Sequence, residues 1–483
     1  MSIKKNFFYN ILYNVVNLLA PMISVPYILR MLGPEGIGRV NYAMSLMGYF
    51  LLVIQIGFIV YAIKETAKVR DDKKELGRVS SELFAVNAIM SSVSLAIYLI
   101  IIISVGKFRS DIVLFMIVGI NIAANIFSID WFYGGIEEYK YITMRNLVIK
   151  TIYIALIFVV IRTQADYLKY VLLGTGALVA GNIINMVYLL KKAELSFVNL
   201  KLKKHFKPIG MMLLVGVLAS IYNKLDVVLL GYMTGPKYVG YYTTCRSITG
   251  IIISFVTALG TVLIPRLAYY LNNGMKNEYK NIAEKSLNFI YFSTFPIIAA
   301  VILLSDEILM LFGGGKFIEA SISLKILSFQ ILANGLSVFL GYQVILANND
   351  EKMLLKASVP AVFVNLAINL LLIKRYFHVA PSIAIVAAET VNVATQFIMA
   401  RKYIKFRIFK AQSMDYLAAS AVLFAVVYLI KKQLHLHFML VLLICLSIYF
   451  FMYCFYLFIR KDDNINTILG LILKKGKSIF ARR

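Results

Sequence analysis

The side chains most able to do chemistry are three charges inside a strongly apolar stretch, residues 221–248. This stretch reads IYNKLDVVLLGYMTGPKYVGYYTTCRSI, so Lys224, Asp226 and Arg246 lie in two apolar segments joined by a Gly-Pro turn. Charge inside a lipid-spanning helix is costly and usually marks a functional site. Asp226 and Arg246 fall at similar depths below the turn, so we predict that they can meet. A structural ion pair and a ligand site both remain open.

The other charges within apolar runs give the predicted membrane interior a positive sum. Glu389 lies near the centre of its run, where we expect it to pair with a cation or to line a cavity. Lys150, Lys325 and Lys356 lie near the ends of their runs, where long stems can reach the headgroups. Together with Lys224 and Arg246 these lysines outnumber the two carboxylates, and a cationic interior suits an anionic cargo.

Two arginines flank an earlier Gly-Pro turn at residues 33–34. The planar guanidinium groups of Arg30 and Arg39 could hold phosphate oxygens in a bidentate way, although ordinary anchoring at the membrane interface is an equal alternative. We therefore predict Arg246, Lys224, Arg30 and Arg39 as substrate-binding residues, and Asp226 and Glu389 as structural or coupling residues.

No grouping of residues predicts an enzyme, a metal site or a cofactor. The segments Gly476–Ser478 and Gly313–Lys316 resemble parts of a phosphate-binding loop but lack its spacing or its hydroxyl residue. His435 and His437 flank a leucine in a short loop, where an interface position is favoured over a metal site. The three cysteines lie in apolar runs without the spacing of metal ligands: Cys245, Cys445 and Cys454.

The composition places the chain in a membrane. Hydrophobic residues make up 60% of its 483 residues and charged residues only 15%, which leaves too little polar surface to cover a soluble globule. The mean hydropathy is +0.80. The net charge of +26 comes largely from bases in short loops between apolar runs, where the rule for helix orientation explains them better than nucleic-acid binding does.

The apolar runs predict an all-α polytopic fold with about fourteen transmembrane helices. Six runs lie between residues 7 and 190, six between 209 and 400, and two more cover 416–430 and 438–459. The tail after Arg460 has apolar residues at helical spacing and basic residues at its end, which is typical of an interfacial helix. We predict two six-helix bundles, an added helix pair and a cytoplasmic amphipathic tail: 1–195, 196–410, 411–460 and 461–483.

The two halves share a motif and an orientation. Gly33-Pro34-Glu35-Gly36-Ile37-Gly38 is repeated as Gly235-Pro236-Lys237-Tyr238-Val239-Gly240, and each copy follows one long apolar run and precedes another. Most of the 50 Lys and Arg residues fall on one side if both termini are cytoplasmic. Because each half has an even number of spans, the copies enter the membrane in the same direction, as in parallel-repeat transporters.

Three motifs resemble those of the bacterial polysaccharide flippases (Wzx-type, oligosaccharide flippase family). They are LRMLGPEGIGRVNYA at 29–43, DWFYGGIEEYKYITMR at 130–145 and IYNKLDVVLLG at 221–231. The resemblance covers nearly the whole chain and implies the multidrug/oligosaccharidyl-lipid/polysaccharide exporter superfamily. In that superfamily two six-helix bundles surround a central cavity that opens alternately inward and outward.

The resemblance also implies a cargo and partners. Members of the family move undecaprenyl-pyrophosphate-linked oligosaccharide units from the inner to the outer leaflet of the cytoplasmic membrane, for assembly of capsule, O-antigen or exopolysaccharide. The implied partners are this lipid-linked oligosaccharide, membrane lipids, a polysaccharide polymerase and glycosyltransferases. Related lipid flippases use cavity arginines, and the matching positions here are Arg30 and Arg246.

Two other functions compete with this interpretation. A cation-coupled multidrug exporter of the same superfamily would have an acidic first bundle, whereas carboxylates between Phe7 and Ile129 occur only in loops or at helix ends. A membrane polymerase or glycosyltransferase would need a large loop with a catalytic set. The longest loops, such as residues 62–82, contain none.

The first prediction concerns topology. With both termini cytoplasmic, residues 62–82 and 191–208 lie inside the cell and Gly235–Tyr238 lies outside. A single cysteine in place of Lys237 should therefore react with an impermeant maleimide in intact cells. Labelling of this cysteine only after permeabilisation would show that the orientation is wrong.

Overall fold

A computed structural model describes residues 3–404, 407–408, 411–462 and 464–465 of the chain. The side chains of residues 3–22, 212, 214–224 and 259 also lie outside the description. Within the described part the chain is helical and has no strand. The predicted amphipathic tail, 461–483, falls almost entirely outside the described residues.

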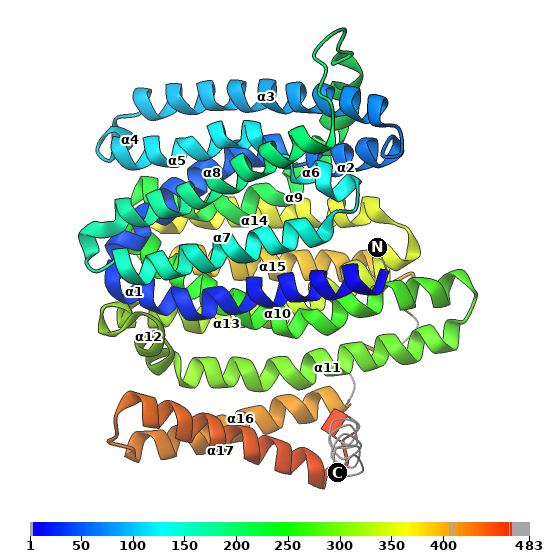
Figure 1. The fold of residues 1–483 in the computed structure, drawn as a ribbon. Helices are drawn as coiled ribbons and strands as arrows, with labels where there is room; N and C mark the ends of the chain where they lie inside the picture. The colour runs from blue at the N-terminus through cyan, green and yellow to red at the C-terminus, as the bar shows by residue number, and fades with distance from the viewer. Residues whose placement is uncertain (1–2, 405–406, 409–410, 463, 466–483) are drawn as a thin grey trace, which may run out of the picture. The chain divides into compact units, whose positions relative to one another are not determined.

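The helices follow the predicted apolar runs (Figure 1). Twelve helical segments in the described residues are long and apolar enough to cross a membrane, which confirms the all-α polytopic class. The predicted count of fourteen stays a prediction. The α-helices are α1 (Ile3–Gln55), α2 (Phe58–Lys68), α3 (Lys73–Ser104), α4 (Gly106–Arg109), α5 (Ile112–Ala124), α6 (Asp130–Gly135), α7 (Tyr139–Val160), α8 (Tyr167–Lys192), α9 (Lys203–Met233), α10 (Pro236–Asn272), α11 (Lys276–Leu303), α12 (Ser305–Gly313), α13 (Ser321–Val338), α14 (Glu351–Tyr376), α15 (Val379–Ala400), α16 (Ala411–Gln433) and α17 (Phe438–Ile459).

The chain forms two compact units. Unit 1 contains residues 1–243 together with 369–381, and unit 2 contains residues 244–368 together with 382–483. Unit 1 therefore includes α9, the start of α10 and the segment that connects α14 to α15. The division of the chain into bundles at 1–195 and 196–410, with a helix pair at 411–460, stays a prediction.

The first two apolar runs meet at a kink in α1. Gly33 has φ 66° and ψ 179°, whereas the residues on both sides are helical. A positive φ is cheap only for glycine, and the fixed φ of the next residue, Pro34, suits the first turn of the new helical segment. Glycine followed by proline thus ends one helical segment and starts the next within two residues.

The two copies of the Gly-Pro motif pack against each other inside unit 1. A Cβ added to Gly38 would lie 1.8 Å from the Pro236 carbonyl oxygen, and one added to Gly240 would lie 1.9 Å from the Pro34 carbonyl oxygen. Equivalent positions of the two copies thus exchange the same contact, as around a local two-fold axis. One turn further on, Asn41 Nδ2 donates to Thr243 Oγ1 at 2.8 Å, and these residues are also equivalent, 202 positions apart.

The loops of unit 1 gather in two groups. At one end, Arg70 from the α2–α3 loop pairs with Glu137 from the α6–α7 loop at 2.7 Å. Among the loops predicted to lie on the other side, Arg39 pairs with Asp111 at 3.4 Å. Each ion pair joins loops that the topology predicts on the same side, which supports the alternation of sides. Which side is cytoplasmic stays a prediction.

In unit 2 the last two helices pack beside α11 (Figure 1). Tyr453 on α17 donates from its hydroxyl to the Phe292 carbonyl of α11 at 2.9 Å. Lys431 at the end of α16 pairs with Glu307 on α12 at 2.8 Å. Buried tyrosine hydroxyls in apolar surroundings need such acceptors, so these contacts set how the helices are rotated against each other.

The close approach of the repeated motifs predicts which glycines tolerate a methyl group. Gly38→Ala and Gly240→Ala should each abolish most of the folded protein, because the added carbon would overlap a backbone carbonyl that cannot rotate away. Even moderate overpacking costs about 1–3 kcal/mol. Gly250→Ala, also on α10, is the matched control, because no atom lies within 4 Å of the added Cβ. Size-exclusion chromatography of a fluorescent fusion measures folded yield. Equal yields for all three variants would refute the packing argument.

Candidate functional site: a polar cavity in unit 1

An interrupted helix introduces polar groups into unit 1. α5 ends at Ala124, and a short 3-10 turn (Asn125–Phe127) and two non-helical residues separate it from α6. The side-chain amide of Asn87 on α3 donates to the carbonyls of Asn125 and Ile126 at 2.7 and 3.2 Å. Non-helical backbone at membrane depth is tolerated only where protein or a water-filled cavity satisfies it. The break therefore indicates a polar cavity.

Neutral amide side chains cluster around this break. Asn125 Nδ2 donates to Asn87 Oδ1 at 3.2 Å and to Ser91 Oγ at 3.1 Å. Gln55 on α1 donates to Asn125 Oδ1 at 3.1 Å. On the neighbouring α8, Asn182 Nδ2 donates to the Ala124 carbonyl at 2.7 Å. The cluster connects four elements of unit 1 and offers donors as well as acceptors.

An arginine–aspartate pair lies beside the amide cluster. Arg145 on α7 holds Asp130 on α6 through two contacts, of 2.8 and 3.3 Å, and also donates to Asn146 Oδ1 at 2.7 Å. Asn185 on α8 donates to Asp130 at 2.6 Å. The Arg145 side chain is only 7% exposed, whereas the Asp130 side chain is 51% exposed. Two parallel bonds to one carboxylate fix the guanidinium plane, so Arg145 positions Asp130 at the cavity wall.

Two adjoining chambers make up the cavity, which we call the amide cavity. The larger has a volume of about 400 Å³ and the smaller about 290 Å³. Ligand sites for small molecules fall at roughly 300–1,000 Å³. The polar groups of the larger chamber include one carboxylate and two cations, and the smaller chamber is mainly apolar. The two chambers share Gln55, Asn125, Ser128, Asp130 and Asn146; the larger adds Asn121, Arg145, Lys150, Tyr153 and Asn182, and the smaller adds Phe58, Ile63, Trp131 and Ile142, among others.

The two arginines predicted at the first Gly-Pro turn do not line the amide cavity. Arg30 is exposed on α1, before the kink. Arg39 pairs with Glu35 at 2.8 Å and with Asp111 at 3.4 Å, and its guanidinium lies over the Tyr167 ring. Two carboxylates thus hold Arg39 in place, which favours the anchoring alternative for this residue.

The charges of the central stretch are distributed over both units. Asp226 is fully buried in unit 1 and accepts hydrogen bonds from Tyr242 Oη at 2.7 Å and Asn369 Nδ2 at 2.8 Å. The side chain of Lys224 lies outside the described residues. Arg246 is half-buried on α10 in unit 2, where Glu389 on α15 is 7% exposed. The pairing of Asp226 with Arg246 stays a prediction.

Sequence analysis alone did not select the residues that line the amide cavity. Asp130 and Arg145 begin and end a motif that carries the family resemblance, and the position of Lys150 near the end of its apolar run predicts that it reaches the headgroups. A usable signal was present in the asparagines. Asn87, Asn121, Asn125, Asn182 and Asn185 all interrupt apolar runs, where an amide without partners would be costly.

A multi-pass helical chain with a polar cavity among its helices has the architecture of a membrane transport protein. Comparison with known proteins narrows this class. The chain belongs to the family described as polysaccharide biosynthesis protein, whose model matches residues 3–271. A second family model, MatE, matches residues 212–371.

Individual relatives agree with this assignment. The chain is 24% identical over 404 residues to an Escherichia coli K12 protein named as an O-antigen transporter, covering 80% of this chain and 94% of that one. It is also 24% identical over 409 residues to the capsular polysaccharide biosynthesis protein CapF of Staphylococcus aureus, covering 81% and 98%. The solved structure of lipid II flippase MurJ, inward closed, shares the fold with a TM-score of 0.73 at 14% identity, covering 94% and 98%. These findings confirm the resemblance and the expectation of a transporter rather than an enzyme.

The Asp130–Arg145 pair can be tested by exchanging its charges. Asp130→Asn should lower the free energy of unfolding by about 1–3 kcal/mol, because it leaves a buried guanidinium with a weaker acceptor. The exchange Asp130→Arg with Arg145→Asp should recover part of the stability that each single reversal loses. Thermal unfolding of the detergent-solubilised protein measures this. A double variant less stable than both single reversals would show that the pair does not position these helices.

Proposed function

We propose that this chain is a flippase for undecaprenyl-pyrophosphate-linked oligosaccharide repeat units. It moves them from the inner to the outer leaflet of the bacterial cytoplasmic membrane, by alternating access, for the assembly of capsule, O-antigen or exopolysaccharide. The amide cavity is the observation that carries the proposal, because it offers amides and cations together inside a membrane-embedded bundle. Membership of a polysaccharide biosynthesis family supports it.

The chemistry of the cavity fits the polar part of such a cargo. A sugar presents hydroxyl groups that both donate and accept hydrogen bonds, and the amides of Asn121, Asn125 and Asn182 can do the same. A pyrophosphate needs countercharge once it leaves water, which Lys150 supplies in the larger chamber. Because hydrocarbon offers neither, the head group passes through the protein while the prenyl chain stays in the lipid.

The predicted site residues enter the proposal with different roles. We assign pyrophosphate binding, at other points on the path of the cargo head group, to Arg246, Lys224 and Arg30. Arg39 is the weakest candidate for this role because it already pairs with two carboxylates. Asp226 and Glu389 are proposed as structural or coupling residues. Both termini are proposed to be cytoplasmic, and a polysaccharide polymerase and glycosyltransferases are the proposed partners.

The alternative function, a cation-coupled multidrug exporter, has one observation in its favour. The MatE model matches residues 212–371, which span parts of both units. The two functions differ in the charge of the cargo. Export of cationic dyes by the purified, reconstituted protein would support the alternative, whereas transfer of an anionic lipid-linked saccharide supports the flippase.

The flippase proposal is tested in cells whose own repeat-unit flippase has been deleted. The native chain should restore surface polysaccharide, whereas folded Arg246→Ala and Lys150→Gln should reduce it. Hydrogen bonds to a charged group contribute about 1.5–3 kcal/mol, which corresponds to a loss of roughly ten- to a hundredfold. Arg246→Lys and Lys150→Arg should recover part of the export, because each keeps the positive charge.

The matched control for these variants is Lys356→Gln, since Lys356 is exposed at the end of a span. Its export should equal that of the native chain. Folded yield in the membrane is measured for every variant, so that lost export is separated from lost protein. If the folded Arg246→Ala and Lys150→Gln proteins export as much polysaccharide as the native chain, neither residue binds the cargo.

A further inference from the structure

The loop between α8 and α9 carries two large apolar side chains that are more than half exposed. Phe197 is 54% exposed and Val198 is 71% exposed. In Figure 1 this green segment rises past α3, on the outside of unit 1. Neighbouring exposed hydrophobic residues at a projecting position are typical of a surface that contacts a partner or a membrane.

Basic residues surround this apolar tip. Residues 191–207 contain six lysines, all exposed, and one acidic residue, Glu194. Two of the lysines are held within the protein, since Lys192 pairs with Glu138 at 2.9 Å and Lys204 pairs with Glu82 at 2.6 Å. The remaining four are Lys191, Lys201, Lys203 and Lys207. The loop thus combines an apolar tip with a strongly positive base.

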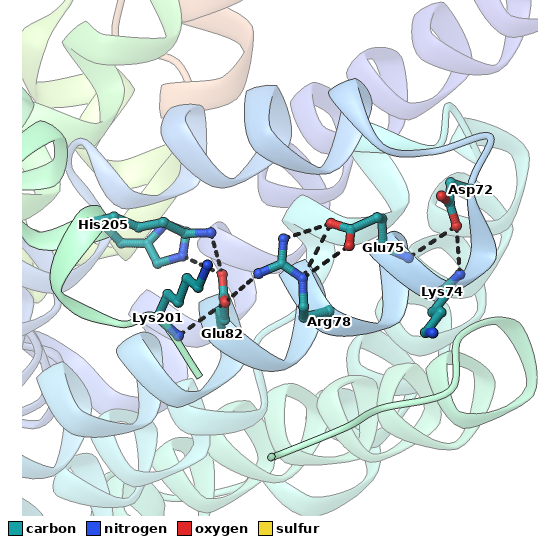
Figure 2. Close-up of polar contacts among 8 residues, drawn as sticks. Asp72, Lys74, Glu75, Arg78, Glu82, Lys201 and His205 are labelled. Atoms are coloured by element: carbon teal, nitrogen blue, oxygen red, sulfur yellow. Dashed lines mark hydrogen bonds and ion pairs between the residues drawn. The ribbon is translucent and has the colours of Figure 1, made fainter. Parts of the chain in front are cut away.

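A buried carboxylate fixes the second half of the loop against α3 (Figure 2). Glu82, which is fully buried, accepts from the Lys201 backbone N–H at 3.1 Å, from Arg78 Nη1 at 3.0 Å and from His205 Nε2 at 3.0 Å. Because a carboxylate only accepts, the imidazole donates from Nε2, and its Nδ1 lies 2.7 Å from the Tyr61 hydroxyl. Burial lowers the pKa of His205, which favours the neutral imidazole whose Nδ1 accepts a hydrogen bond from that hydroxyl.

The first half of the loop is fixed as well. The Ser196 backbone N–H donates to Ser81 Oγ at 2.8 Å. A Cβ on Gly77 would lie 2.1 Å from the Glu194 carbonyl oxygen, so the loop backbone rests directly on α3. Both halves are therefore held on one helix, and the tip at residues 197–198 is presented in a defined place.

The side of α3 that carries Glu82 continues, further along the helix, into a stripe of exposed apolar residues. Ile89, Val93 and Ile100 follow Glu82 by 7, 11 and 18 residues, which places them on the same side of the helix. All three side chains are exposed, at 43%, 55% and 64%. An exposed apolar stripe on a membrane-spanning helix is typical of a surface that faces lipid. The loop adjoins one end of this stripe.

We propose that residues 191–207 form a membrane-surface anchor that binds anionic phospholipids of the leaflet on this side. Phe197 and Val198 insert between the headgroups, and the lysines contact lipid phosphates. The orientation rule accounts for lysines on the cytoplasmic side, but it does not account for an exposed apolar pair held above a lipid-facing helix. The anchor lies within unit 1, between α8 and α9.

The test places a fluorescent reporter at the tip. Val198→Cys is labelled with bimane in a Cys454→Ser background, since Cys245 and Cys445 are buried. The protein is reconstituted in vesicles of phosphatidylcholine alone or of phosphatidylcholine with one quarter phosphatidylglycerol. Lipids with brominated acyl chains should quench the reporter fluorescence, and iodide in the buffer should not quench it. Phosphatidylglycerol should increase both the quenching by bromolipid and the protection from iodide. Replacing Lys191, Lys201, Lys203 and Lys207 by Gln should remove this dependence on phosphatidylglycerol.

The matched control is Asp71→Cys, in the neighbouring α2–α3 loop, whose native side chain is 98% exposed. It should stay open to iodide and unquenched by bromolipid in both vesicles. Equal iodide access at positions 198 and 71 would overturn the anchor. Bromolipid quenching at position 198 that is the same in both vesicles would overturn the binding of anionic lipid. A single symmetric size-exclusion peak for each variant shows that it is folded.

Discussion

Hydrocarbon offers no hydrogen-bond partner, and this constraint explains most of the polar architecture of unit 1. Where α5 is interrupted, the amide of Asn87 reaches the carbonyls of Asn125 and Ile126. Where a carboxylate is fully buried, as at Asp226, a tyrosine and an asparagine donate to it. In both places a polar group within the helices is stabilised by hydrogen bonds from side chains of other elements. Polar side chains therefore occur in groups that hydrogen-bond to one another. Where such a group does not fill the space between the helices, it lines a cavity.

The same constraint makes close backbone packing between helices an important source of stability. Without a hydrophobic force between helices in lipid, association depends on close packing, which small residues permit. Gly38 and Gly240 bring the two copies of one motif into backbone contact in a reciprocal way. The duplicated motif is thus a joint between repeats, and its glycines serve packing as well as the turn. A duplicated chain can form such a joint because equivalent surfaces fit each other around a local two-fold axis.

Charged side chains in this protein differ in their surroundings. Arg145 pairs with Asp130, and Arg39 pairs with Glu35 and Asp111. Lys150 lines a chamber whose other polar groups are mostly amides, which is a suitable environment for a sugar phosphate. The positive loop before α9 lies apart from this cavity and belongs to the membrane surface. The basic residues behind the net charge of +26 thus occur in ion pairs between helices, in the amide cavity and in the proposed lipid anchor.

The sequence by itself determined the class of fold, the repeat and the family, because hydropathy, the Gly-Pro motif and charge in loops are local properties that survive in any packing. It also showed that Asp226 and Glu389 are buried in helices. Only the tertiary structure decided which polar side chains meet. Asn87 and Asn125 lie on different helices, and Asp130 and Arg145 lie on either side of a loop, so their contacts depend on helix rotation and crossing. Apolar periodicity was too weak to predict that rotation, since a helix surrounded by lipid and protein is apolar on nearly all sides.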